Sequence, residues 1–178
     1  MRVRYIYKLI IILSVMPVLT SCASAQTNKP SYNGLLELAK NIITVSKELD
    51  VINIKLRVLC RMDKPVVQKD LLDGLNRVSE VIDHVSRVSS YESQLLMTIP
   101  YIKEEEREAF VVIRTTEIEK PIQYFPAFLQ ELNYYYNNGR YWSVLFTLDN
   151  PIPRIEKIIK YLSEAKEILV RTQTPKNK

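Results

Sequence analysis

Apolar residues recur at alternating steps of three and four positions in the segment that follows residue 34, and this spacing constrains the fold more than any other feature. Because an α-helix has 3.6 residues per turn, residues at this spacing line up along one side of a helix. The repeat lasts for more than three heptads and forms a seam of Leu35, Leu38, Ile42, Val45, Leu49, Ile52, Leu56 and Leu59. The segment is therefore predicted to be a long helix that buries this side against other helices.

The apolar side of this helix is expected to be wide, because further apolar residues stand beside the seam, namely Leu36, Ile43, Val51 and Ile54. A wide apolar side favours a bundle of several helices over a two-stranded coiled coil. The helix is predicted to end within residues 61–65, because the residue before Pro65 avoids helical backbone angles. Cys60, near that end, is predicted to be a small buried apolar residue. The alternative is a disulfide with another molecule in an oxidising compartment.

A second repeat begins at about Val66 and stops near Pro100, with a seam formed by Leu71, Leu75, Val78, Ile82 and Val85. The polar run Ser89–Ser93 weakens this repeat, which predicts either a kink or a polar layer at that point. The short link at Pro65 predicts that the first two helices are antiparallel neighbours.

A third helix is expected after Pro100, with Glu104–Glu108 in its first turns, where acidic side chains complement the helix dipole. Pro121 and Pro126 are expected to interrupt this helix by a kink or a restart, because proline lacks the backbone N–H that an interior position donates. Gly139 is expected to end the helix as a left-handed cap.

Residues 140–148 are rich in aromatic and β-branched side chains, so they are compatible with a strand or a short helix, and the helical surroundings favour the helix. Asn150 followed by Pro151 predicts the start of a last helix, whose seam is Ile155, Ile158, Leu162, Ala165 and Leu169. The chain has three glycines, too few for the many tight turns of a sandwich or barrel. We therefore expect an all-α fold, an up-and-down bundle of four or five helices with a proline-interrupted third helix.

The first 22 residues form three zones in the order of an export signal. Arg2, Arg4 and Lys8 make a positively charged beginning, and residues 9–19 are an apolar run. A membrane-spanning helix needs roughly 20 apolar residues, so this shorter run suits the apolar part of a signal peptide.

Leu19-Thr20-Ser21-Cys22 closes this segment and resembles the lipobox of bacterial lipoproteins, in which small residues precede the cysteine. The resemblance implies cleavage before Cys22, a diacylglyceryl thioether on its thiol, and usually a further acyl chain such as palmitate on the new amine. Because Ala23 and not aspartate follows, it also implies the periplasmic side of the outer membrane if the source is a Gram-negative bacterium. The alternative is an ordinary secretory signal, or an uncleaved anchor, with a chance cysteine.

Cleavage at this point divides the chain into a signal peptide (1–21), a lipidated cysteine with a flexible tether (22–30), a helical-bundle domain (31–171) and a basic tail (172–178). The signal contains three of the 25 Lys and Arg and none of the 20 acids, so its removal lowers the formal net charge from +5 to +2. Such a small charge does not favour a nucleic-acid partner. With Cys22 lipidated, no second thiol remains for an intramolecular disulfide with Cys60.

Few residues in the sequence indicate catalysis or metal binding. His84 is the only histidine, and of its neighbours only Glu80 shares its helix face, which falls short of a metal site. His84 is therefore expected to be a boundary or surface residue, and the run 104–108 a solvated helix start. No catalytic residue, metal ligand or cofactor is predicted.

Aromatic residues gather between positions 124 and 146 and include three consecutive tyrosines. Three tyrosines in a row cannot all face one core, so at least one is expected to be exposed. Because tyrosine and tryptophan are enriched at protein interfaces, the candidate partner-binding residues are Tyr134, Tyr135, Tyr136, Tyr141 and Trp142. The alternative is that these side chains fill one end of the core, with their hydroxyls reaching water.

These observations predict a non-enzymatic lipoprotein of the cell envelope that acts as an interaction or accessory subunit of an envelope assembly. Its layout, a small helical domain behind a lipobox, is similar to that of the pilot lipoproteins of secretin channels. The alternative is a lipoprotein that binds a small ligand or peptide in an aromatic-lined groove between helices. A pocket at residues 134–142 would favour ligand binding, and a flat exposed aromatic patch would favour the interaction subunit.

Overall fold

The computed structural model describes residues 30–62 and 69–173. Its long helices are α2 (Pro30–Met62), α3 (Lys69–Thr98), α4 (Glu104–Asn137) and α6 (Ile152–Gln173). The short elements are the 3-10 helices η1 (Ile99–Tyr101) and η2 (Gly139–Tyr141) and the helix α5 (Trp142–Leu145). The all-α prediction is confirmed, with four long helices and no strand in the described part of the chain.

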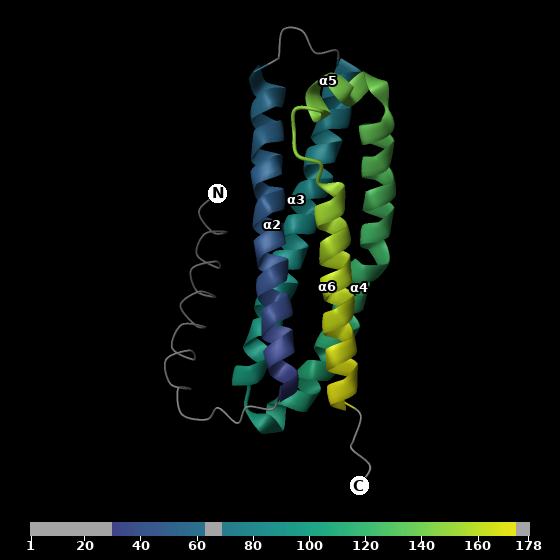
Figure 1. The fold of residues 1–178 in the computed structure, drawn as a ribbon. Coiled ribbons are helices and arrows are strands. Elements are labelled where there is room, and N and C mark those ends of the chain that lie inside the picture. The colour runs from purple at the N-terminus through teal and green to yellow at the C-terminus, as the bar shows by residue number, and fades with distance from the viewer. Residues whose placement is uncertain (1–29, 63–68, 174–178) are drawn as a thin grey trace, which may run out of the picture.

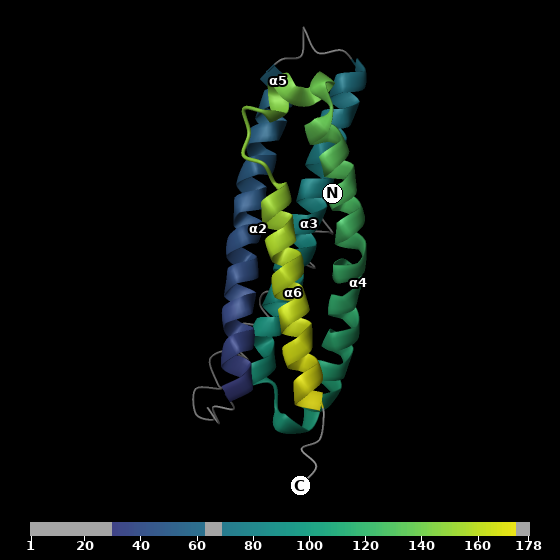
Figure 2. The ribbon, with the colours of Figure 1, turned by 45° about the vertical axis from the view of Figure 1, so that its right-hand side comes forward.

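The four long helices form an up-and-down bundle. Figure 1 shows α2 running towards the end of the molecule that carries α5, α3 returning, α4 running the same way as α2, and α6 returning. Each helix packs against two neighbours in the ring α2–α3–α4–α6. Because α6 has 22 residues and α2 has 33, α6 stops short of one end, and η2 and α5 cover that end (Figures 1 and 2).

The predicted seams of α2, α3 and α6 form the core. All five predicted seam residues of α6 are fully buried, and those of α2 and α3 are buried apart from half-buried Leu38, Leu59 and Leu71. Cys60 is also buried, as predicted. The expected start of the second helix at Val66 lies outside the described residues, but the antiparallel packing of α2 and α3 is confirmed.

The buried side of α2 is narrower than the sequence predicts. Val51 and Ile54 are exposed, and Leu36 and Ile43 are half-buried. The prediction that these residues widen the apolar side is therefore wrong for Val51 and Ile54. Because α2 is contacted by α3 and by α6 along adjoining sides, the positions opposite the core face solvent.

A ladder of polar contacts at seven-residue intervals joins α3 to α2. The hydroxyls of Ser79, Ser86 and Ser93 donate to Asn53 Oδ1 at 2.6 Å, to the Ser46 carbonyl at 2.9 Å and to the Ala39 carbonyl at 2.6 Å, respectively. Ser89 adds a 2.7 Å bond to the hydroxyl of Ser46. The predicted polar layer is confirmed, and α3 passes through it without a break. Such pairs fix the register of two helices, because a shift would bury the polar groups without partners.

α4 continues through both of its prolines. One helix runs from Glu104 to Asn137 with Pro121 and Pro126 inside it, so the helix does not restart at the prolines and the structure shows no interruption there. Figure 1 shows that α4 bends but does not break. Phe125, which lies between the prolines in the sequence, is fully buried, and α4 packs against both α3 and α6. This packing outweighs the two backbone hydrogen bonds that the prolines remove.

The connection from α4 to α6 differs from the prediction at one residue. Gly139 does not adopt a left-handed cap, since no described glycine has a positive φ. Instead, the side chain of Asn138 accepts a hydrogen bond from the backbone N–H of Arg140 at 3.1 Å. The short helix expected within residues 140–148 is confirmed as α5. Asn150 caps α6 as predicted, because its Oδ1 accepts the N–H of Ile152 at 3.0 Å.

Gly74 of α3 permits a close approach of Tyr141. A Cβ atom at position 74 would overlap the Tyr141 hydroxyl and would lie 2.5 Å from Cε1 of its ring. Tyr141 is buried, so its ring has little room to move. Gly74→Ala is therefore expected to lower the free energy of unfolding, measured by urea denaturation, by about 1–3 kcal/mol.

Gly34 of α2 provides a matched control. A Cβ atom at position 34 would lie 3.6 Å from Cδ1 of Ile168, which is an ordinary contact. Gly34→Ala is expected to raise the free energy of unfolding by about 0.5–1 kcal/mol, because alanine loses less backbone entropy in a helix. Stabilisation by both replacements would contradict the close packing of Tyr141 on α3.

Candidate functional site

The candidate tyrosines lie at the end of the bundle that carries α5, opposite the start of α2 (Figure 1). We call this the aromatic end and define it by the last two turns of α4, η2 and α5. Tyr134, Tyr135 and Tyr136 belong to α4, and Tyr141 ends η2. Trp142 begins α5, but its side chain lies outside what the structure describes.

Three tyrosine rings form a stack that leads from the core to the surface. Tyr141 is buried, and its ring centroid lies 5.1 Å from that of Tyr135 at an interplanar angle of 86°. The Tyr135 ring lies 5.3 Å from that of Tyr134 at 74°. These edge-to-face contacts are favourable for aromatic rings. Tyr134, at the outer end, is 62% exposed, which confirms that at least one tyrosine of the run faces solvent.

Tyr136 points into the core. Its hydroxyl is buried and has no hydrogen-bond partner among the described residues. Burial raises the pKa of Tyr136 above its ordinary value, and the negative charge of Asp149 raises it further. Tyr136 and Tyr141 therefore fill one end of the core, whereas Tyr134 is displayed.

An ion pair fixes the part of α4 that presents Tyr134. Arg77 of α3 donates from Nε to Glu131 Oε1 at 2.6 Å and from Nη2 to Oε2 at 3.1 Å. This bidentate geometry is the most directional form of a carboxylate contact. Burial raises the pKa of Tyr135, and the nearby Glu131 carboxylate adds to this effect. Glu131 lies one turn before Tyr134, so the ion pair ties this turn of α4 to α3.

A second polar feature, a buried ion pair between Glu92 of α3 and Arg114 of α4, was not predicted from the sequence. The two side chains are 8% and 13% exposed, and Oε2 of Glu92 lies 3.7 Å from Nη1 of Arg114. Glu92 Oε2 and Arg114 Nε have no hydrogen-bond partner among the described residues. The Arg114 guanidinium lies 5.6 Å from the centre of the Phe110 ring.

The protonation of Glu92 follows from this burial. Burial raises the pKa of the Glu92 carboxyl above its ordinary value. The positive charge of Arg114 opposes this rise, Glu117 adds to it, and Lys120 opposes it. Glu92 belongs to the polar run noted in the sequence, but spacing within one helix contains no sign that Arg114 lies opposite.

The remaining residues considered in the sequence, His84, Glu80 and the acids at the start of α4, lie at the surface of the bundle. His84 is exposed, and its ring lies 5.8 Å from that of Tyr124 and 5.5 Å from that of Phe128, as expected for a surface histidine. Glu80 pairs with Arg77. The first-turn acids of α4 are exposed, as predicted. In the part of the chain that the structure describes, no three His, Cys, Asp or Glu side chains gather to hold a metal ion.

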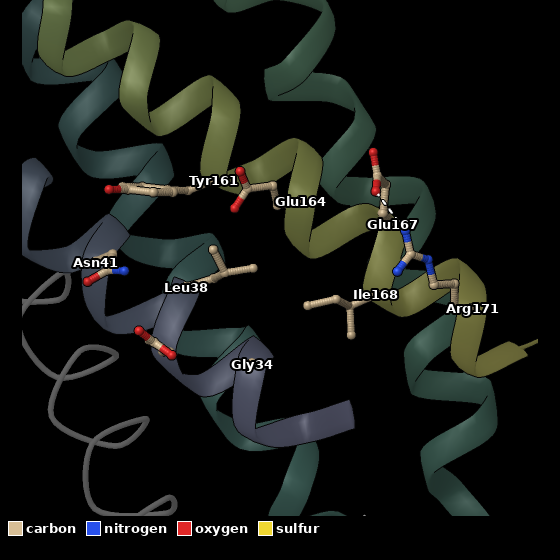
Figure 3. Close-up of a pocket in the computed structure, with 9 residues that line it drawn as sticks. Gly34, Leu38, Asn41, Tyr161, Glu164, Glu167, Ile168 and Arg171 are labelled. Atoms are coloured by element: carbon tan, nitrogen blue, oxygen red, sulfur yellow. Dashed lines mark hydrogen bonds and ion pairs between the residues drawn. The ribbon is translucent and has the colours of Figure 1, made fainter. Parts of the chain in front are cut away.

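Among the described residues, open grooves lie between α2 and α6, between α4 and α6 and between α2 and α3, and none of these three is lined by the candidate tyrosines. The groove between α2 and α6 has a volume of about 460 Å³, and Glu37, Glu164 and Glu167 are among the residues that line it. Figure 3 shows Glu164 and Glu167 on α6. Arg171, which also lines this groove, is paired with Glu167 at 3.1 Å. The other two grooves, of about 440 and 470 Å³, lie between α4 and α6 and between α2 and α3. None of these three grooves is therefore the aromatic-lined pocket at residues 134–142 that would favour ligand binding.

Comparison with known proteins adds no family and no activity. No protein-family model, no curated protein and no solved structure matches this chain. Among the helices of residues 30–62 and 69–173, none is long and apolar enough to cross a membrane. Conclusions about function therefore depend on the chain's own residues.

Proposed function

We propose that this chain is a lipoprotein of the cell envelope, anchored by lipid on Cys22, that acts as a non-enzymatic interaction or accessory subunit of an envelope assembly. In a Gram-negative host the proposed location is the periplasmic side of the outer membrane, because Ala23 follows the cysteine. The anchor rests on residues 19–22, which lie outside the described residues. The observation that carries partner binding is the exposure of Tyr134 at the outer end of an ordered aromatic stack.

Tyr134 has the properties of a contact residue. Tyrosine offers a large surface and has few rotatable bonds, so little side-chain entropy is lost when it is immobilised. The edge-to-face contact with Tyr135, and the ion pair of Glu131 with Arg77, order its surroundings before a partner binds. This pre-organisation supports an exposed tyrosine that contributes strongly to binding.

The position of the aromatic end is compatible with an anchor. α2 begins at Pro30 and has 33 residues, so it extends about 50 Å from the tether to the opposite end of the bundle. Figure 1 shows the aromatic end at that opposite end. A lipid on Cys22 therefore leaves Tyr134 accessible to a partner.

Tyr134→Ala is expected to reduce capture of a protein partner about tenfold or more, which corresponds to the loss of one dominant contact residue. The measurement is chemical crosslinking in cells, followed by affinity capture of the tagged mature chain and quantitative mass spectrometry. Helicity by circular dichroism is expected to stay unchanged, because the Tyr134 side chain is mostly outside the core.

Tyr91→Ala is the matched control. Tyr91 is 58% exposed, close to the exposure of Tyr134, but it belongs to α3. Its replacement is expected to leave capture unchanged. If the two variants capture the same proteins in the same amounts as the wild type, the aromatic end is not the contact surface and the proposed role is wrong.

A further inference from the structure

α2 carries a second stripe of residues on the side opposite the core. Seven exposed positions follow one another at alternating steps of four and three, namely Lys40, Thr44, Lys47, Val51, Ile54, Val58 and Arg61. Because this spacing follows the helical turn, the seven side chains share one side of α2. We call this set the outer stripe. It includes Val51 and Ile54, which the sequence predicts to widen the buried side of the helix but which are exposed.

Every charged residue of the outer stripe is basic. The exposed acids of α2 lie on its flanks: Glu48 accepts a 2.8 Å hydrogen bond from Arg154 of α6, and Asp50 Oδ1 lies 2.6 Å from the Ser86 hydroxyl of α3, which it shares with the Ser46 carbonyl. Glu37 lines the groove between α2 and α6. The carboxylates of α2 are thus turned away from the outer stripe.

The basic residues of the outer stripe form no ion pair with other described residues of the bundle. Of the ion pairs formed among described residues, none involves Lys40, Lys47 or Arg61. The other basic residues of this stretch of α2 face neighbours, since Lys55 pairs with Asp149 and Arg57 with Asp83. Among the described residues, therefore, no carboxylate forms an ion pair with the basic side chains of the outer stripe.

The centre of the outer stripe is apolar. Val51, Ile54 and Val58 occupy successive turns, and each is about half exposed or more. A helix face with an apolar centre and basic ends is typical of segments that lie in the plane of a membrane. There the apolar side chains enter the headgroup region, and the basic side chains meet anionic phosphates.

We infer that the outer stripe docks on an anionic phospholipid surface and lays α2 along the bilayer. This inference rests on the proposed lipid anchor. Pro30 follows Cys22 by eight positions, so the chain between them can span at most about 28 Å. That reach allows α2 to lie flat and keeps the outer stripe close to the surface. A second copy of the chain fits less well, because it would bring Lys40, Lys47 and Arg61 against the same positive charges.

α4 offers an internal comparison with opposite charge. Its exposed Ile113 resembles Ile54, with exposed fractions of 53% and 61%. The neighbouring part of α4, however, carries the exposed acids Glu105, Glu106 and Glu108. An anionic surface therefore attracts the outer stripe and repels this part of α4.

The test places a fluorophore at each isoleucine in the mature, lipidated chain. Ile54→Cys and Ile113→Cys, each in a Cys60→Ala background, are labelled with a nitrobenzoxadiazole dye and reconstituted into vesicles with brominated acyl chains. In vesicles of equal parts phosphatidylglycerol and phosphatidylcholine, the label at position 54 is expected to be quenched several-fold more than the label at 113. Pure phosphatidylcholine, or Lys40→Glu combined with Lys47→Glu, is expected to bring position 54 to the level of position 113.

Flotation of the vesicles separates the possible failures. If the chain floats but positions 54 and 113 are quenched equally, the docking inference is wrong and the anchor stands. If the chain does not float, the anchor fails and the docking inference fails with it. A disulfide between two unlabelled Ile54→Cys copies, without quenching of the labelled chain, would assign the outer stripe to a second copy and overturn the inference.

Discussion

Replacing Cys22 by serine is expected to abolish labelling by an alkyne fatty acid and to leave the precursor uncut. In the proposed lipoprotein, the Cys22 thiol accepts the diacylglyceryl group as a thioether, and a serine hydroxyl cannot form that bond. The measurements are in-gel fluorescence after coupling of the alkyne to a dye, and the difference in gel mobility that residues 1–21 produce. Because labelling is all or none, this is the largest effect expected of any single replacement.

Cys60→Ala is the matched control for this experiment. Cys60 is buried in α2 and is not part of the sequence 19–22 that resembles a lipobox, so this variant is expected to be labelled and processed like the wild type. Membrane fractionation alone does not decide the question, because an uncut Cys22→Ser precursor keeps the apolar run of residues 9–19. Normal labelling and processing of Cys22→Ser would show that the lipobox assignment is wrong.

The spacing of apolar residues predicts most of the fold, because burial along one side of a helix is a local property of the chain. In α6, the spacing alone predicts that Ile155, Ile158 and Leu162 are buried, and all three are fully buried. The Asn150 cap also depends on a neighbour in the sequence, the N–H of Ile152. The helical class and the up-and-down order follow from such local signals and short links.

Features that depend on contacts between helices were predicted poorly. Val51 and Ile54 resemble buried Ile52 in chemistry, and only the positions of α3 and α6 around α2 decide which of them is covered. Pro121 and Pro126 are strong local breakers, but packing of α4 on two neighbouring helices keeps it continuous. A local reading of the sequence misses such packing because the covering residues are distant in the chain.

One contact between helices leaves a signal in the sequence that extends beyond the predicted polar layer at Ser89–Ser93. Ser79, Ser86 and Ser93 stand seven residues apart on an otherwise apolar side of α3. Their partners on α2 are spaced by seven as well, so an antiparallel pairing of the two sets would have predicted the polar ladder.

For the candidate site, the sequence predicted that a tyrosine is exposed. It did not identify Tyr134, because that depends on which side of α4 faces α3 and α6.

Removing one partner of the buried Glu92–Arg114 pair is expected to lower the free energy of unfolding by about 3–5 kcal/mol. Arg114→Met leaves the Glu92 carboxyl in a site where its side chain is 8% exposed, and Glu92→Leu leaves an almost buried guanidinium. In each case a charge or a polar group loses its partner away from water. Urea denaturation of the two single variants measures the loss.

The double variant Glu92→Leu with Arg114→Met is expected to regain most of this stability, or to exceed the wild type by about 1–4 kcal/mol. Glu92 Oε2 and Arg114 Nε have no hydrogen-bond partner among the described residues. Hydrogen bonds within the protein therefore do not fully offset the free-energy cost of burying the two charged groups. Arg171→Met is the control, because Arg171 pairs with Glu167 on the surface. Its loss is expected to cost at most about 1 kcal/mol. Additive losses in the double variant would contradict a direct interaction.

The pH dependence of stability distinguishes burial of Glu92 from stabilisation by Arg114. Burial raises the pKa of the folded carboxyl above the ordinary value of 4.5, which the unfolded chain retains. Between these two values the folded protein binds more protons, so the contribution of Glu92 to the free energy of unfolding falls as the pH rises and is lost above the folded pKa. Glu92→Gln lacks this titration, so the free energy of unfolding of the wild type minus that of the variant is expected to fall with pH and then level off. A difference that rises with pH would mean that Arg114 stabilises the carboxylate by more than burial destabilises it.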